Sequence, residues 1–226
     1  MPNGMKRIIT LWVLLLVWWM PSRAQDSAHY HTFLKFNPST ITNELDFYVE
    51  QELSSSMSLE AGGGFIFTDY WDLLLNKMNF GEIKPNISEY QYLHGMGYDA
   101  RIGLRYYIIS SYSRANRARG TYFEPIFLFK KVIYPNNRTT VDAQDYWSHA
   151  LKYVEGLQLL IGRQYLSGRF ILDNYLGLGV KAKTYHYDHY YDLSGQAKNG
   201  RLRTTNWLPS IQLGVKIGLQ LQKRER

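Results

Sequence analysis

One short stretch of the sequence combines residue types that could bind a metal ion. Residues 185–192 read YHYDHYYD, so two histidines and two aspartates fall close together. The candidate ligands are His186, Asp188, His189 and Asp192. Imidazole and carboxylate groups are ligands that transition metals prefer, and a loop could bring all four onto one ion. Their spacing is loose and no second cluster of this kind follows, which favours a tyrosine-rich rim where a strand ends.

Two pairs of serine and histidine could supply a nucleophile and its base. Ser148 precedes His149, and Ser194 lies a few residues after His189. A hydrolase needs such a pair within hydrogen-bond distance, together with an acid that orients the histidine. Neither pair lies in a recognisable catalytic motif. We therefore expect no catalytic residue, no cofactor and no bound metal.

The composition excludes several other classes of site. The 226 residues include no cysteine, which rules out thiolate metal centres, iron–sulfur clusters, thiol nucleophiles and disulfides. The formal net charge is +7, but no basic face interleaved with aromatic residues is present, so we expect no nucleic-acid partner. Aromatic residues make up 15% of the chain, led by 19 tyrosines. Such a composition suits β-strands and the interfaces of a membrane.

Most charged residues alternate with apolar ones, which indicates strands with one polar and one apolar face. In 172–183, for example, leucine and valine alternate with aspartate, glycine and lysine. The chain holds eight such segments, one of them weak, with lengths near the ~9–11 residues of a tilted strand that crosses a bilayer. The segments lie at 31–37, 45–50, 58–67, 98–106, 123–130, 157–162, 172–183 and 211–220.

The connections between these segments alternate in length. Tight turns are expected at Ser54–Ser56 and Ser167–Gly168, and long loops at Thr68–Gly95, Pro135–Ala150 and His186–Asn206. Outer-membrane barrels have short periplasmic turns and long outer loops. The first long loop contains an apolar stretch, which could form a short helix over the barrel mouth or on the membrane surface.

The charged face of these strands would form the interior of a barrel in a membrane, with the glycines that share it. Aromatic residues near the strand ends fit the two interfacial girdles of such a barrel. The expected interior polar network consists of Asp46, Glu50, Glu60, Asp99, Arg101, Arg105, Glu124, Asp173, Lys181, Lys183 and Lys216. Eight strands leave room only for side chains, and unpaired buried charge is very unfavourable, so we expect a plug. A narrow ion or proton path, or a ligand or catalytic role for part of the network, are the alternatives.

The first 24 residues have the organisation of a signal peptide. Lys6 and Arg7 precede the apolar run Ile8–Met20, and small residues precede a cleavage site between Ala24 and Gln25. An uncleaved anchor is the alternative, but the run is shorter than the ~20 residues that a spanning helix needs. We expect residues 1–24 to be removed and residues 25–226 to form the barrel domain.

The segment Asp173–Val180 and the closing strand Ile211–Leu221, after a signal ending in Ala-Gln, give the chain a recognisable pattern. It resembles the small eight-stranded outer-membrane β-barrel proteins, the OmpX- and OmpA-like barrels, particularly the poorly characterised ones of Bacteroidota-type bacteria. The resemblance covers most of the chain after residue 25. It implies an all-β, antiparallel, up-and-down transmembrane β-barrel in the outer membrane of a Gram-negative cell. The end at Gln222–Arg226 departs from the terminal Phe of proteobacterial barrels, which serves as an assembly signal.

We therefore predict an exported outer-membrane barrel without enzymatic activity, in contact with outer-membrane lipid. Its role would be structural, or it would bind a protein or envelope partner through its extracellular loops. Two alternatives remain at this point. One is a lipid-modifying hydrolase of the outer membrane, and the other is a soluble, lipocalin-like carrier in the periplasm.

Overall fold

A computed structural model describes residues 31–54, 56–77, 87–108, 120–141, 144–193 and 196–221. The predicted signal peptide, with its cleavage between Ala24 and Gln25, lies outside the described residues, as does the Gln222–Arg226 tail. Within the described residues, no helix has the length and apolar character needed to cross a membrane.

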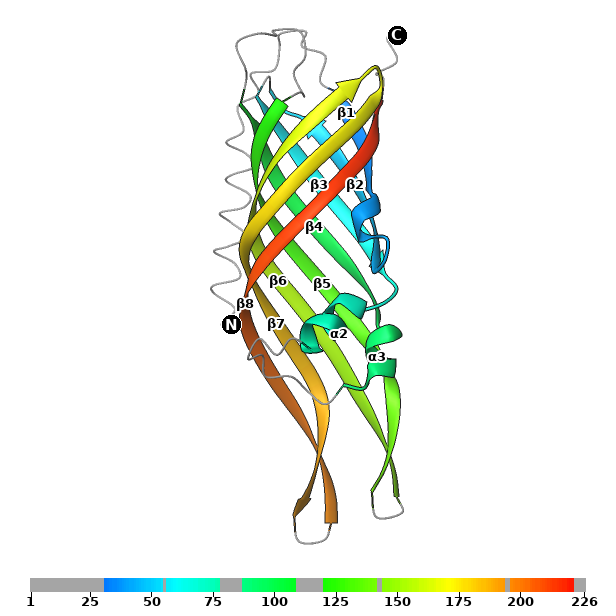
Figure 1. Ribbon diagram of the computed structural model, residues 1–226. Helices are drawn as coiled ribbons and strands as arrows, with labels where there is room; N and C mark the ends of the chain where they lie inside the picture. The colour runs from blue at the N-terminus through cyan, green and yellow to red at the C-terminus, as the bar shows by residue number, and fades with distance from the viewer. Residues whose placement is uncertain are drawn as a thin grey trace.

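Eight antiparallel strands form a closed barrel in which each strand pairs with its neighbours in the sequence (Figure 1). The strands are β1 (Thr32–Asn37), β2 (Glu44–Glu52), β3 (Met57–Ile66), β4 (Met96–Tyr107), β5 (Gly120–Val141), β6 (Gln144–Ser167), β7 (Phe170–Leu193) and β8 (Gln196–Leu221). The ring closes between the two ends of the chain, where Thr32 pairs with Leu221 and Phe36 with Ile217. The predicted all-β, up-and-down barrel of eight strands is confirmed.

The two halves of the barrel wall differ in length. The first four strands have 6 to 12 residues, whereas the last four have 22 to 26. β5–β6 and β7–β8 therefore continue as two hairpins beyond the rest of the barrel (Figure 1). The prediction of loops at Pro135–Ala150 and His186–Asn206 is wrong, because these segments continue the strands. Side chains such as Asn137 and Arg203 break the hydrophobic alternation there while the backbone pairing continues.

Three short helices lie in the connections on the side toward which the long hairpins project (Figure 1). A 3-10 helix, η1 (Pro38–Thr40), connects β1 to β2 and lies against the barrel wall, and α2 (Tyr70–Lys77) and α3 (Glu89–Leu93) lie between β3 and β4 at the mouth. Leu73 of α2 is buried with Tyr92 of α3 in one apolar cluster. Of the two places predicted for a helix in this connection, the barrel mouth is therefore the observed one.

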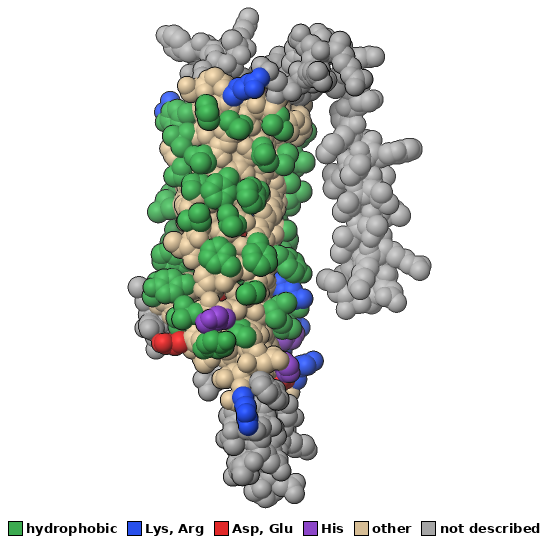
Figure 2. All heavy atoms as spheres, turned by 90° about the vertical axis from the view of Figure 1, so that its right-hand side faces the viewer, with side chains coloured by type: hydrophobic (Ala, Val, Ile, Leu, Met, Phe, Trp, Pro, Cys, Tyr) green, Lys and Arg blue, Asp and Glu red, His purple; other side chains and the backbone are tan. Residues whose placement is uncertain are grey.

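The outward side chains of the strands are apolar over a wide band (Figure 2). On β7, for example, Leu172, Leu176, Leu178 and Val180 are 40–52% exposed, whereas the odd-numbered residues from 173 to 179 face the interior. Successive residues of a strand point to opposite faces of the sheet, so the alternation in the sequence places all these leucines outside.

Aromatic rings mark the edge of this apolar band near the helices. Tyr98, Phe129, Tyr153 and His186 lie on adjacent strands β4 to β7, and successive ring centroids are 6.4, 6.3 and 5.7 Å apart. Trp207 of β8 is 74% exposed close to the same level. Beyond these rings the outward residues of β8 are threonine and arginine.

Glycines on the inner face make room for tyrosines of the neighbouring strand. Three tyrosines lie directly opposite a glycine, and the pairs are Tyr48–Gly62, Tyr122–Gly162 and Tyr175–Gly214. A Cβ atom on Gly162 would lie 2.4 Å from the hydroxyl oxygen of Tyr122, which no real contact permits. These glycines are therefore required by the close approach of large rings inside a narrow barrel.

Candidate functional site

A buried ion network fills the barrel near the end opposite the helices. This central network contains three cations and four carboxylates, each at most 3% exposed: Lys35, Arg105, Lys216, Glu50, Glu60, Glu124 and Asp173. The guanidinium of Arg105 lies 2.8 Å from Glu60 and 2.9 Å from both Glu124 and Asp173. Charge-assisted hydrogen bonds of this kind are among the strongest in proteins, so Arg105 holds four strands together.

Two tyrosines complete the central network. The Tyr122 hydroxyl donates to Asp173 over 2.6 Å, and the Arg105 guanidinium lies 3.9 Å from the centre of the Tyr122 ring. The Tyr107 hydroxyl donates to Glu50 over 2.6 Å. A cavity of about 10 Å³ lies beside the network, which is close to the space that one water needs. At this level the barrel is a solid plug.

A second network surrounds Arg101, nearer the helices. Its guanidinium donates to Glu44 and Asp99, over 2.7 Å each, and lies 3.0 Å from Asp46, while Lys130 also pairs with Glu44. The three carboxylates are close enough to bind one metal ion. Because the Arg101 guanidinium already pairs with all three, we assign no metal here.

A third network fixes α2 inside the barrel mouth. The carboxylate of Asp72 accepts hydrogen bonds from Lys152 over 2.8 Å and from Lys183 over 2.7 Å. Asp69 also accepts from Lys152, and from the hydroxyl of Tyr134. Asp69 and Asp72 thus bring negative charge from the β3–β4 connection to lysines on the inner faces of β6 and β7.

The two aspartates of this mouth network titrate in opposite directions. Burial by itself would raise the pKa of Asp72, but Lys152 and Lys183 outweigh burial and hold this pKa well below its ordinary value of 3.8. For Asp69, burial and the adjacent charge of Asp72 outweigh Lys152 and raise the pKa. A carboxylate whose pKa is lower in the folded than in the unfolded protein stabilises the fold at pH values above its unfolded pKa. The ion pairs of Asp72 therefore stabilise the mouth fully above about pH 4, and this stabilisation is lost in stronger acid as Asp72 becomes protonated.

Substituting Asp72→Asn is expected to loosen α2 while leaving the strands paired. The lysines then lose the charge that compensates their burial, a change that strongly destabilises buried ion pairs. We expect hydrogen exchange at the α2 amides to accelerate at least about tenfold, which corresponds to 1.4 kcal/mol. The control is Asp188→Asn, because the partner of Asp188, Arg201, is 77% exposed. Equal α2 protection in both variants and the parent would contradict the role of this network.

The structure brings nearly all the predicted interior residues together. Ten of the eleven are buried, at 0–8% exposure, and the eleventh, Lys181, is half-buried. They divide among the three networks, except that Lys181 belongs to none of them. The sequence analysis missed five important members: Lys35, Glu44, Asp69, Asp72 and Lys152. The alternation signal could have found Lys35 and Glu44, which continue the inward positions of their strands.

The predicted serine–histidine pairs do not form a catalytic pair within the described residues. Ser148 and His149 are consecutive in β6 and so point to opposite faces of the sheet. The Ser148 hydroxyl donates to the carbonyl of Asn137 over 3.2 Å, and His149 is exposed. Ser194 and the side chain of His189 lie outside the described part of the structure.

The predicted metal cluster on β7 is only partly described. His186 packs edge-on against the ring of Tyr153, and Asp188 accepts a hydrogen bond from the backbone N–H of His149 over 3.1 Å. The side chains of His189 and Asp192 lie outside the described residues. The two described members thus contribute to the outer surface of β7, beyond the apolar band.

Comparisons with protein-family models, with curated proteins and with solved structures each found no match. The fold and its interior therefore define the class of this protein. It is a closed, eight-stranded antiparallel β-barrel with ion networks inside and an apolar band outside.

Proposed function

We propose that the protein is an integral barrel of a Gram-negative outer membrane, of the OmpX- and OmpA-like kind that its sequence resembles. In this proposal it crosses the membrane as a plugged cylinder and acts as a binding protein at its outer end. The observation that carries the proposal is the apolar band on the outer face, edged by aromatic rings on the side of the helices, around an ionic interior. A water-soluble barrel has the opposite arrangement, with apolar side chains inside and polar side chains outside.

The free energy of hydration supports this assignment. A soluble monomer rarely exposes an apolar patch of more than a few hundred Å², whereas here outward apolar residues lie on all eight strands. Each strand of the closed ring pairs with two neighbours, so most of the backbone in the wall is hydrogen-bonded internally, as a chain in hydrocarbon requires. A soluble carrier of apolar ligands would need its apolar side chains inside, where this barrel has its ion networks.

The plug supports a binding or structural role rather than transport through the barrel axis. Arg105 and its partners fill the interior near the β6–β7 turn, and each of these charged groups is already paired. The other end is different, because a cavity of about 480 Å³ lies between α2 and the inner wall of β5 to β8. The outer end is therefore where we place ligand binding.

Spin labels can test the membrane assignment sharply, because the chain has no cysteine of its own. We would label Leu178→Cys in the apolar band and Thr205→Cys beyond the aromatic rings, and insert each folded variant in lipid vesicles. The label at 178 is expected to collide with dissolved oxygen and to be protected from a water-soluble nickel complex. The label at 205 is expected to show the opposite preference.

Two results bear directly on the proposal. Equal access of the nickel complex to positions 178 and 205 would contradict the membrane assignment, because both positions would then be in water. A steady ion current through the parent protein in a planar bilayer would overturn the plugged state while leaving the membrane assignment intact.

A further inference from the structure

The barrel wall has a lateral gap beside β8. Residues 217–221 of β8 pair with β1, but residues 206–216 pair only with β7. On the open side lies η1, whose Ser39 hydroxyl accepts a hydrogen bond from the backbone N–H of Val215 over 3.4 Å. An unpaired strand edge at membrane depth is tolerated only where it lines a polar cavity or is covered by protein.

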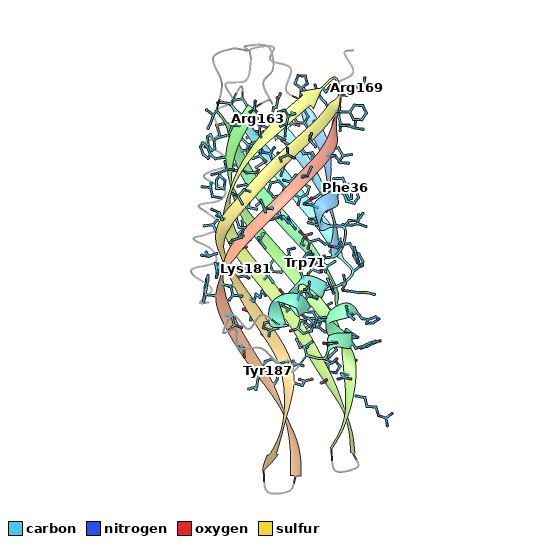
Figure 3. The ribbon with its side chains drawn as sticks, viewed as in Figure 1. Phe36, Trp71, Arg163, Arg169, Lys181 and Tyr187 are labelled. Carbon is cyan, nitrogen blue, oxygen red and sulfur yellow. The ribbon has the colours of Figure 1, made fainter. Side chains whose placement is uncertain are left out.

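A cavity of about 480 Å³ lies behind this gap. Its lining includes Ser210 and Gln212 of β8, the lysines of the inner wall, and Asp72 of α2. Lys181 of β7 and Trp71 of α2, both labelled in Figure 3, belong to this lining. The cavity is therefore continuous with the interior of the outer half-barrel and with the gap in its wall.

Among the charged side chains that line the cavity, one cation has no carboxylate partner in the described structure. Lys152 and Lys183 pair with the aspartates of the mouth network, and Arg101 and Lys130 pair with Glu44. Lys181, in contrast, has no carboxylate within ion-pair distance among the described residues. A half-buried lysine without a partner is unfavourable, and an anion in the cavity would compensate its charge.

The cavity also holds unused hydrogen-bond acceptors. Gln158 is 3% exposed, and its amide N–H donates to the Ser210 hydroxyl over 2.5 Å, while its carbonyl oxygen has no partner in the described structure. The side-chain oxygen of Asn43 is likewise buried without a described partner. Buried acceptors of this kind favour a ligand that carries hydroxyl groups.

Apolar side chains surround the opening of the cavity on the lipid side. Ile211 and Leu213 of β8 line it and are 72% and 73% exposed on the outer face, and Trp71 is 54% exposed. A group inside the cavity could therefore remain attached to an alkyl chain that lies along β8 in the membrane. The polar interior and the apolar opening together match an amphiphile.

We infer that this lateral cavity binds the phosphate-bearing, hydroxylated headgroup of an anionic lipid, whose chains stay outside on β8. Lys181 neutralises the phosphate, and Gln158 and Asn43 accept from the headgroup hydroxyls. The inference rests on the proposed membrane function, because the lipid enters sideways from the bilayer. It names the ligand class for the binding role assigned to the outer end.

Phosphatidylglycerol is a suitable probe, since its headgroup has both a phosphate and free hydroxyls. We would measure binding of a short-chain, fluorescent form to the full protein in nonionic detergent. Phosphatidylcholine with the same chains and glycerol phosphate without chains are the comparison ligands. The parent protein is expected to bind phosphatidylglycerol at least tenfold more tightly than either one.

Substituting Lys181→Met is expected to weaken phosphatidylglycerol binding at least tenfold. Lys131→Met is the matched control, because Lys131 lies on the outer face beside Tyr153. The Lys181→Met barrel is expected to unfold at the same temperature as the parent or higher, since an unpaired charge has been removed. A residue with a merely structural role would show the opposite change in stability.

Each contrary result overturns the inference. Undiminished binding by Lys181→Met excludes Lys181 as the phosphate ligand, and a lowered unfolding temperature shows that Lys181 stabilises the fold instead. Equal affinity for glycerol phosphate excludes the lateral position of the chains. A protein that passes the spin-label test but does not prefer phosphatidylglycerol refutes this inference alone, whereas failure of the spin-label test removes the membrane function.

Discussion

Substituting Arg105→Met is expected to abolish folding of the barrel or to lower its free energy of unfolding by about 3–5 kcal/mol. Arg105 is completely buried and pairs with Glu50, Glu60, Glu124 and Asp173. Without its guanidinium, four carboxylates on different strands share only two lysines. The uncompensated negative charge then repels strands that the network now joins.

The effect of Arg105→Met can be measured by urea unfolding in detergent micelles, with the heat-dependent shift in gel mobility as a second readout. Arg163→Met is the control, because Arg163 is exposed on the outer face. Its guanidinium carbon lies 5.1 Å from the centre of the Tyr165 ring, outside the central network. It is expected to change stability by less than about 0.5 kcal/mol. Similar losses in the two variants would mean that the central network does not hold the barrel together.

The second large effect is expected from a charge in the middle of the apolar band. Leu176 is 40% exposed on the outer face of β7, roughly halfway along the apolar part of that strand. In a bilayer, Leu176→Arg should destabilise the folded protein by about 2–4 kcal/mol, because arginine at the midplane must leave water. Thr205→Arg, beyond the aromatic rings, should cost no more than about 1 kcal/mol.

Reversible unfolding from lipid vesicles measures this difference directly. The two substitutions add the same side chain to adjacent strands, so the comparison isolates depth in the membrane. In detergent, where headgroups adapt to the protein, the difference should shrink. Equal destabilisation at 176 and 205 in vesicles would be incompatible with a membrane-spanning band.

The number and order of the strands could be predicted from the sequence because each strand separates two environments. Segments such as 98–106 and most of 172–183 alternate, because the outward side chains are apolar and the inward ones meet the ion networks. The prediction lost accuracy at the outer ends of β5 to β8. In the described parts of these hairpins, polar residues such as Asn137, Arg201 and Arg203 interrupt the hydrophobic alternation while the backbone pairing continues.

The sequence predicts which residues face the interior better than it predicts which of them form ion pairs with one another. Asp173 and Arg105 could be assigned to the inner face from alternation alone, but their contact depends on strands that are far apart in the sequence. Asp69 and Asp72 could not be found in this way, because they enter the barrel from a connection rather than a strand. Lys181 was grouped with the paired lysines, and only the structure separates it from them.

The seam between β1 and β8 has a consequence for biogenesis. It consists of five residue pairs and joins the first described strand to the last, so it cannot form before Ile217–Leu221 have left the ribosome. Until then the growing polypeptide has two open strand edges, which invite aggregation, and contacts of such long range form slowly. We therefore expect the translated chain to depend on a chaperone until its last strand is complete, and a truncation that removes Ile217–Leu221 to aggregate rather than to close into a smaller barrel.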